Sequence, residues 1–243
     1  MEYKGAVRMS DRHPIWVLIP VKETAGAKTR LESVVPLHLR HGLALAMLED
    51  VLDAVAGVRN IAGLIVVTVD AAATVLAKRY SARIMTDGAT TGHSGAVNTA
   101  AALLATEGKR GFLQIPLDIP LVSSEEISTL VGMHRGGPSF IIAPSNDELG
   151  SNGVLVSPPT SVPLTFGDDS YVPHLRAAEK CGIRPQVVRL PGFGLDIDRP
   201  DDLYEFAKLR SDTRTQEYLD RHRLAPGLPK QSAGRDNAPP RRP

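Results

Sequence analysis

The sequence predicts an α/β domain in which helices cover both faces of a mainly parallel β-sheet. Short, almost wholly apolar runs at Ile15–Pro20 and 61–70 have the composition of strands buried on both faces. Segments with apolar residues at helical spacing follow them, and this alternation of strand and helix repeats along the chain. A chain of 243 residues, 42% of them hydrophobic, is long enough to bury one large core.

Each predicted element has a local signal. After the first strand comes a polar loop, and a helix then begins at Pro36 and ends at Gly57. The same rhythm continues to His134, where strands are expected at 82–86 and 112–117 and helices at 71–80, 94–107 and 123–134.

The pattern changes after Gly136. Short strands at 140–143 and 154–156 are expected around a polar turn at 145–153, followed by a helix at Tyr171–Lys180 and a strand at 186–190. A long polar helix begins at Asp201 and fades near His222. We expect a single domain at 14–222, a flexible polar N-terminus at 1–13 and a disordered tail at 223–243, because 5 of the last 20 residues are proline and none is aromatic.

Composition excludes several classes of function. The 28 Lys and Arg nearly balance the 27 Asp and Glu, so no overall field attracts nucleic acid or an anionic membrane. No apolar run approaches the ~20 residues that span a bilayer. The single cysteine, Cys181, excludes a disulfide framework and is expected to be a small packed residue in a reducing compartment. We therefore expect a cytoplasmic protein without a nucleic-acid or membrane partner.

The loop after the first strand carries three cations, Lys22, Lys28 and Arg30. In open α/β sheets ligands bind beyond the carboxyl ends of the strands, so these side chains are placed to surround a triphosphate. The glycines of a P-loop and of a dinucleotide-binding turn are both missing. The alternative is a solvated basic loop.

Two acidic features follow later strands. Asp118 ends the fourth strand between two prolines, and Asp196 and Asp198 lie two residues apart in an extended segment. Mg²⁺ prefers one or two carboxylates together with phosphate oxygens, so we expect Asp118 and Asp196 to be ligands of Mg²⁺. The alternative is that Asp118 is only a turn residue at the end of the strand. Asp198 precedes Pro200 and a helix, so it is equally a metal ligand or a helix cap.

Small and neutral polar residues form a third feature. Ser151, Gly167 and Ser170 offer hydroxyl and backbone donors that suit a carboxylate or phosphate, although Ser170 also fits as a helix cap. Asn98, early in an apolar helix, is a candidate for contact with a base or ribose, or for hydrogen bonding to neighbouring backbone.

Taken in order, PVK, AKTRL, LDIP, GSNG, FGDDSYVPH and GLDIDRPDDL resemble the 2-phospho-L-lactate guanylyltransferase family of deazaflavin coenzyme biosynthesis. The resemblance covers roughly residues 15–209, and the family is related to the molybdenum-cofactor guanylyltransferases. It implies a Rossmann-like nucleotide-diphospho-sugar transferase fold with a mixed sheet. It also implies transfer of GMP from GTP to 2-phospho-L-lactate, phosphoenolpyruvate or 3-phospho-D-glycerate, with release of pyrophosphate.

The resemblance also assigns roles to residues. It implies phosphate contacts by Lys22, Lys28 and Arg30, Mg²⁺ ligands at Asp118, Asp196 and Asp198, and an acid site at Ser151, Gly167 and Ser170. Two departures stand out: Gly-Ser-Asn at 150–152 replaces Gly-Thr-Asn, and Gly-Ala-Val-Asn98 replaces Gly-Leu-Asn.

The mechanism expected is direct attack by the acid's phosphate oxygen on the α-phosphorus of GTP, with Asp118 and the cationic loop as the catalytic residues. The sequence leaves open whether this protein contacts the next enzyme of the pathway to pass on its unstable product. The alternatives are a molybdopterin or sugar-phosphate nucleotidylyltransferase, or a nucleotide sensor without catalysis.

Overall fold

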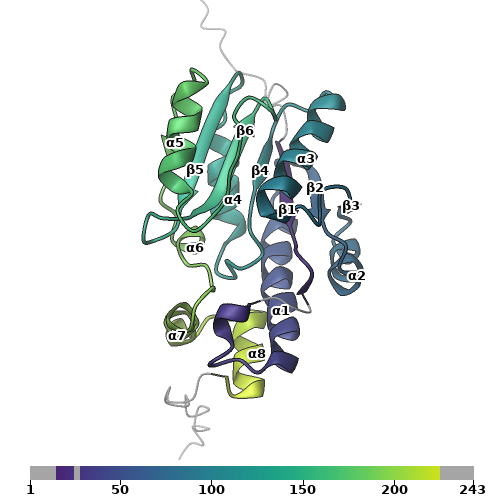
Figure 1. The fold of residues 1–243 in the computed structure, drawn as a ribbon, viewed down its shortest axis with the longest axis vertical. Coiled ribbons are helices and arrows are strands. Elements are labelled where there is room, and N and C mark those ends of the chain that lie inside the picture. Colours follow the sequence, from purple (N-terminus) through teal and green to yellow (C-terminus); the bar gives the residue numbers. More distant parts are fainter. Residues whose placement is uncertain (1–14, 25–27, 225–243) are drawn as a thin grey trace, which may run out of the picture.

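A seven-stranded sheet runs through the computed structural model, which describes residues 15–24 and 28–224 (Figure 1). The strand order is β3-β2-β1-β4-β6-β5-β7. Strand β6 is antiparallel to its neighbours β4 and β5, and the other adjacent pairs are parallel. The prediction of a mixed, mostly parallel sheet is therefore confirmed. The N-terminus expected to be flexible, at 1–13, lies outside the described residues, as does the expected tail beyond Leu224.

The strands are β1 (Ile15–Pro20), β2 (Ile61–Val67), β3 (Arg83–Met85), β4 (Phe112–Gln114), β5 (Ser139–Pro144), β6 (Ser151–Ser157) and β7 (Gln186–Val187). The α-helices are α1 (Leu37–Ala56), α2 (Ala71–Arg79), α3 (Gly92–Thr106), α4 (Ser124–Met133), α5 (Tyr171–Lys180), α6 (Pro191–Gly194), α7 (Pro200–Leu209) and α8 (Arg214–His222). A 3₁₀ turn, η3 (Thr29–Leu31), precedes α1.

Helices cover both faces of the sheet, because successive side chains of a strand point to opposite sides. Val17 and Ile19 of β1 pack in one apolar cluster with residues of α1, α2 and α4. Leu18, between them, packs in a second cluster with residues of α3 and α5. Each fully buried side chain of this kind stabilises the fold by about 1.5–3 kcal/mol.

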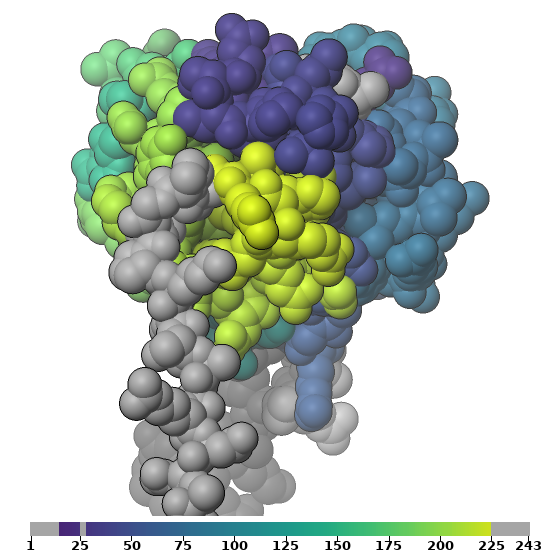
Figure 2. Space-filling model, turned by 90° about the horizontal axis from the view of Figure 1, so that it is seen from below, coloured from purple at the N-terminus to yellow at the C-terminus, as the bar shows by residue number. Residues whose placement is uncertain are grey.

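A third apolar cluster lies beyond the sheet, where the start of α1 meets α7 and α8. We call it the terminal cluster; it consists of Leu31, Val35, Leu43, Ala44, Met47, Ile197, Leu203, Phe206, Ala207, Leu219 and Leu224. Figure 2 shows α8, in yellow, beside the purple start of the domain. The Asp50 carboxylate of α1 fastens α8 by accepting hydrogen bonds from Arg214 N (2.8 Å) and Thr215 N (2.9 Å).

Several predicted boundaries were wrong. The helix expected from Asp201 to His222 is two helices, separated where Arg210 adopts a positive φ of 51° and Thr213 caps α8. The polar turn expected at 145–153 ends at Gly150, because residues 151–153 pair with β5. The strand expected at 186–190 has only two residues, Gln186 and Val187, and α6 follows.

Two residues expected to be packed or disordered were also misjudged. Cys181 is exposed at the end of α5 and is not a packed residue. Leu224, assigned to the tail, is 5% exposed because it closes the terminal cluster.

Candidate active site

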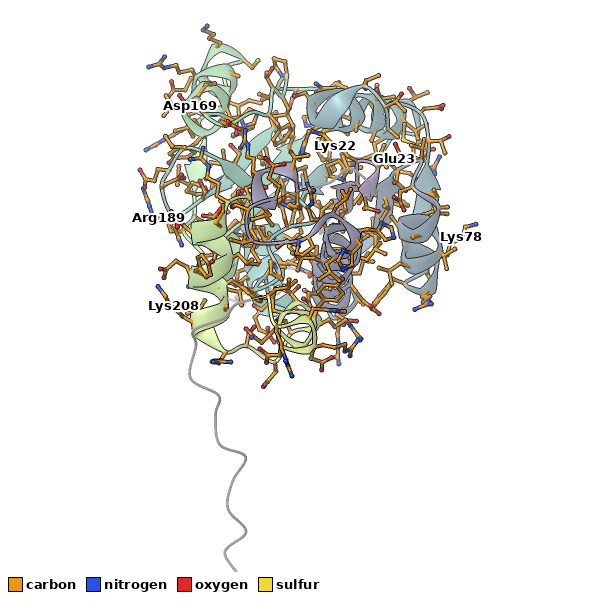
Figure 3. All side chains as sticks on the ribbon, turned by 60° about the horizontal axis from the view of Figure 1, so that its bottom comes forward. Lys22, Glu23, Lys78, Asp169, Arg189 and Lys208 are labelled. Carbon is orange, nitrogen blue, oxygen red and sulfur yellow. The ribbon has the colours of Figure 1, made fainter. Side chains whose placement is uncertain are left out.

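A pocket of about 440 Å³ opens at the carboxyl ends of β1 and β4. Its walls come from the loop after β1, the start of α3, the segment after β4 and the loops before α5 and α7. Figure 3 shows Lys22 and Glu23 near α3, and Asp169 at the foot of α5. The ionisable residues that line the pocket are Lys22, Glu23, Lys28, Arg30, His93, Asp118, Asp168 and Asp198.

The centre of the site is the ammonium of Lys28, held between two carboxylates. Its Nζ lies 2.7 Å from Asp118 Oδ2 and 2.7 Å from Asp198 Oδ1. The Lys28 side chain is only 8% exposed. Burial alone lowers the pKa of Lys28, but the two adjacent carboxylates outweigh burial and raise it. The predicted loop and both acidic segments therefore meet at one cation.

The terminal cluster positions both sides of this centre. Leu31, three residues after Lys28, and Ile197, immediately before Asp198, are both fully buried in it. The Ile197 N–H also donates a 3.0 Å hydrogen bond to the carbonyl of Asp118. Segments far apart in the sequence are thus joined by shared packing and by a direct backbone contact.

Asp198 does not serve as the cap of α7. Its backbone N–H and that of Arg199 both donate to the carboxylate of Asp202, at 3.0 and 2.7 Å. The Asp198 side chain is left for Lys28. Burial raises the pKa of Asp198, but Lys28 outweighs burial, so the pKa is lowered from its usual value.

Asp196 lies beside this centre without contacting Lys28. Its Oδ1 accepts a 3.0 Å hydrogen bond from Asn152 Nδ2. Burial raises its pKa to about 6; the Asn152 hydrogen bond opposes that rise, and the charges of Asp118 and Asp198 add to it. Within residues 15–24 and 28–224, no three His, Cys, Asp or Glu side chains are placed to hold a metal ion.

The chemistry of the side chains nevertheless fits a hard divalent cation. The carboxylates of Asp118 and Asp198 converge on one positively charged atom, and oxygens are the ligands that Mg²⁺ prefers. The pocket lining has three cationic side chains, Lys22, Lys28 and Arg30, against four carboxylates. This deficit of positive charge would oppose a polyphosphate unless a cation entered with it.

Arg30 and Lys22 stand nearer the solvent. The Arg30 guanidinium pairs with the Asp168 carboxylate at 2.8 and 3.1 Å, which links the first loop to the loop before α5. Arg30 is 50% exposed and Asp168 70% exposed, so water screens the pair and it contributes at most about 1 kcal/mol to stability.

A hydrogen-bond network that the sequence did not reveal anchors the start of the first loop. Buried Thr24 donates to Asp70 Oδ2 from its backbone N (2.8 Å) and from its hydroxyl (2.6 Å). The same hydroxyl lies 2.6 Å from His41 Nδ1. Asp70 also caps α2 by accepting from Ala73 N, so the loop is tied to the end of β2 and to α1.

The residues expected to bind the acid are close together on the β6 and α5 side. Ser170 Oγ donates to Ser151 Oγ at 3.0 Å, and both residues are buried. Ser170 occupies the N-cap position of α5, but its side chain makes no capping hydrogen bond. Gly167 is exposed in the loop between Phe166 and Asp168, with open space where a side chain would be.

The side-chain amide of Asn98 is hydrogen-bonded to the backbone of Leu164. Its Nδ2 donates to the Leu164 carbonyl at 2.8 Å, and its Oδ1 accepts from Leu164 N at 3.4 Å. This matches the second of the two interpretations of Asn98. The same helix carries His93, to which the sequence analysis gave no role and which lines the pocket. The ring centroids of His93 and Phe166 are 4.4 Å apart, and His93 Nε2 lies 3.2 Å from Gln114 Nε2. Burial lowers its pKa to about 4.

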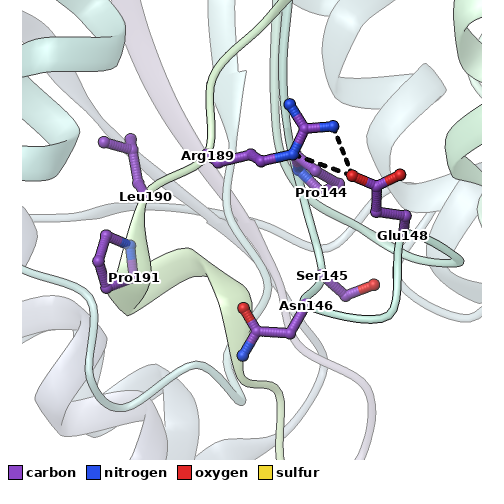
Figure 4. A pocket seen from close by; sticks show the side chains of 7 residues that line it. All are labelled: Pro144, Ser145, Asn146, Glu148, Arg189, Leu190 and Pro191. Carbon is purple, nitrogen blue, oxygen red and sulfur yellow. Dashed lines mark hydrogen bonds and ion pairs between the residues drawn. The ribbon is translucent and has the colours of Figure 1, made fainter.

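A second, smaller cleft of about 320 Å³ lies between the end of β5 and α6 (Figure 4). Its ion pair joins Arg189 Nε to Glu148 Oε1 at 2.9 Å, and both side chains are largely exposed. It lacks a buried charge centre like that of Lys28, and we place the candidate active site in the larger pocket.

Two solved structures with the same fold are described as transferases. A protein from Desulfovibrio desulfuricans G20, described as a nucleotide-diphospho-sugar transferase, superimposes with a TM-score of 0.68 at 18% identity, covering 86% of this chain and 95% of that one. A nucleotidyl transferase from Methanothermobacter thermautotrophicus gives 0.58 at 17% identity, covering 86% and 99%. These identities establish the fold alone.

Sequence relatives are closer. The chain is 33% identical over 192 residues to a phosphoenolpyruvate guanylyltransferase of Rubrobacter xylanophilus, covering 78% of this chain and 91% of the relative. It is 34% identical over 201 residues to a 3-phospho-D-glycerate guanylyltransferase of Colwellia psychrerythraea, covering 83% and 94%. It is 31% identical over 202 residues to a 2-phospho-L-lactate guanylyltransferase of Methanothermobacter thermautotrophicus, covering 83% and 88%.

The family described as "Guanylyl transferase CofC like" matches residues 15–238, which include every residue of the Lys28 centre. With the relatives above, this match extends over nearly the whole described domain. The chain therefore belongs to the CofC-like guanylyl transferase family.

Proposed function

We propose that this enzyme transfers GMP from GTP to a phosphorylated three-carbon acid and releases pyrophosphate, as a step of deazaflavin coenzyme biosynthesis. The acid is phosphoenolpyruvate, 3-phospho-D-glycerate or 2-phospho-L-lactate, the acids in the names of its relatives. The observation that carries the proposal is the buried Lys28 ammonium, 2.7 Å from both Asp118 and Asp198, in a pocket with two further cations.

The reaction needs no protein nucleophile, because the acceptor phosphate is already an anion. One of its oxygens forms a bond to the α-phosphorus of GTP while the bond from that phosphorus to the oxygen bridging to the β-phosphorus breaks, and pyrophosphate leaves. The task of the protein is to bring two anions together and to offset their repulsion. Lys22, Lys28 and Arg30 are proposed to contact the phosphates, which requires Arg30 to exchange Asp168 for a phosphate oxygen.

We propose that Mg²⁺ would take one or two carboxylate ligands from Asp118, Asp196 and Asp198, together with phosphate oxygens of the substrates. When bound, the ion would polarise the α-phosphate and neutralise charge that develops in the transition state. Asp118 and Asp198 already converge on a cation, and Asp196, whose pKa burial raises to about 6, lies beside them within reach of their charges. Ser151, Gly167 and Ser170 are proposed to bind the acid through hydroxyl and backbone donors.

The decisive experiment is a panel of acceptors with GTP or ATP and Mg²⁺, followed by product mass and pyrophosphate release. We expect turnover with GTP and at least one of the three acids. Turnover only with molybdopterin or a sugar phosphate would replace the proposed substrate class. Binding of GTP without release of pyrophosphate under any condition would mean a nucleotide sensor.

A further inference from the structure

His174 is a buried polar residue on the acid side that the proposed mechanism does not use. It is 1% exposed, on the inner side of α5. Its two ring nitrogens have different partners. Nε2 lies 3.1 Å from the backbone N of Thr165, and Nδ1 lies 2.9 Å from Ser151 Oγ.

These partners fix the tautomer of the ring. A backbone N–H can only donate, so the His174 Nε2 facing Thr165 must carry the lone pair. A neutral imidazole has one N–H, and it is therefore on Nδ1, pointing at Ser151 Oγ. Burial lowers the pKa of His174 to about 4, which keeps the ring neutral in neutral solution.

The tautomer in turn fixes the Ser151 hydroxyl. Ser151 Oγ accepts from His174 Nδ1 at 2.9 Å and from Ser170 Oγ at 3.0 Å. A hydroxyl oxygen has two acceptor lone pairs, and both are now used. Its own hydrogen has no acceptor within the described parts of the chain, so it remains available for a ligand.

We infer that His174 is a positioning residue that makes Ser151 an obligate hydrogen-bond donor toward an oxyanion of the acid substrate. The group that fits there is a phosphate or carboxylate oxygen, which only accepts; an ammonium or another N–H donor is rejected. The inference rests on the proposed function and deepens it, because it explains how a neutral side chain discriminates for anionic acids.

A matched pair of variants isolates the proton on Nδ1. The side-chain amide of asparagine places its nitrogen near the Nδ1 position, so His174→Asn keeps the donor to Ser151. Glutamine reaches the Nε2 position instead, so His174→Gln keeps a partner for Thr165 and loses the donor. We expect His174→Gln to raise the KM for the acid roughly 10- to 100-fold, the effect of losing a hydrogen bond to a charged group.

The expected pattern separates positioning from general stability. The KM for GTP should stay within about twofold of the wild type in both variants, and His174→Asn should retain most of the affinity for the acid. Equal rises of the acid KM in the two variants, or a parallel rise of the GTP KM, would overturn the inference.

Nuclear magnetic resonance tests the tautomer without any variant that needs to fold. The ¹⁵N shifts of the His174 ring should report a protonated Nδ1 and an unprotonated Nε2, whereas the opposite tautomer would refute the inference. Calorimetric titration of phosphoenolpyruvate and inorganic phosphate into the wild type, Ser151→Ala and His174→Gln tests anion binding without turnover. If the wild type binds both anions and the variants bind them weakly, the inference stands even if no acid is guanylylated; unchanged binding in both variants overturns it.

Discussion

Replacing Lys28 by methionine tests whether Asp118 and Asp198 form a site for a cation. The substitution keeps much of the side-chain volume but leaves two carboxylates facing each other. Removal of one partner from a buried ion pair costs roughly 3–5 kcal/mol. Asp118 and Asp198 are 20% and 42% exposed, so water screens part of this repulsion and we expect a loss of about 1–3 kcal/mol.

The loss of stability in Lys28→Met should depend on pH. Lys28 lowers the pKa of Asp198 in the folded protein, so this carboxylate contributes stability above the ordinary carboxylate range and loses it as the pH falls through its lowered pKa. The difference in unfolding free energy between wild type and Lys28→Met should therefore be largest near pH 7 and shrink below about pH 4.

Urea titrations with and without Mg²⁺ complete the assay. The variant should regain stability in Mg²⁺ by about 1.4 kcal/mol at ten times the dissociation constant, and the wild type by less, because Lys28 competes for the same oxygens. Lys208→Met is the control: its pair with Glu205 is exposed, 55% and 63%, and we expect a change below about 0.5 kcal/mol. Equal stabilisation of wild type and Lys28→Met by Mg²⁺ would refute the reasoning.

Three further substitutions have defined outcomes. Asp118→Asn should lower pyrophosphate release by roughly 100-fold or more with an unchanged circular dichroism spectrum, and retained turnover would reject the mechanism. Because the pKa of Asp196 is raised to about 6, its ionisation opposes folding as the pH rises. Without metal, the unfolding free energy of Asp196→Asn should therefore exceed that of the wild type by about 1–3 kcal/mol at pH 8 and match it at pH 4. A pH-independent difference in urea titrations would contradict this. At Gly153 an added Cβ would lie 2.7 Å from Phe193 Cε1, so Gly153→Ala should lose about 1–3 kcal/mol in urea, whereas Gly132→Ala in α4, with open space at that position, should lose nothing.

The sheet could be predicted because its strands are buried on both faces. The apolar composition of β1 and β2 and the helices that follow them left little freedom for another fold. Elements that depend on distant contacts were harder to predict. The composition of Ser151–Gly153 is typical of a turn, but pairing with β5 makes this segment a strand, and Phe193 packs closely against Gly153.

The site could be predicted in part for a topological reason. Lys28 and Asp118 follow strands β1 and β4, which lie side by side in the sheet, so their loops emerge at one edge. Sequence could not show that Lys28 itself would fill the space between Asp118 and Asp198. Nor could it assign His174, although a histidine one helical turn after Ser170 was the available signal.

The terminal cluster joins helices from opposite ends of the chain, and this sets an order during synthesis. Leu43 and Met47 leave the ribosome early, but Leu219 and Leu224, which cover them, are among the last residues of the domain to be made. Since chains emerge from their N-terminus, one side of α1 stays uncovered until α8 has been made. A nascent chain stopped before α8 would already contain Lys28, Asp118 and Asp198, yet the terminal cluster beside them would lack Leu219 and Leu224.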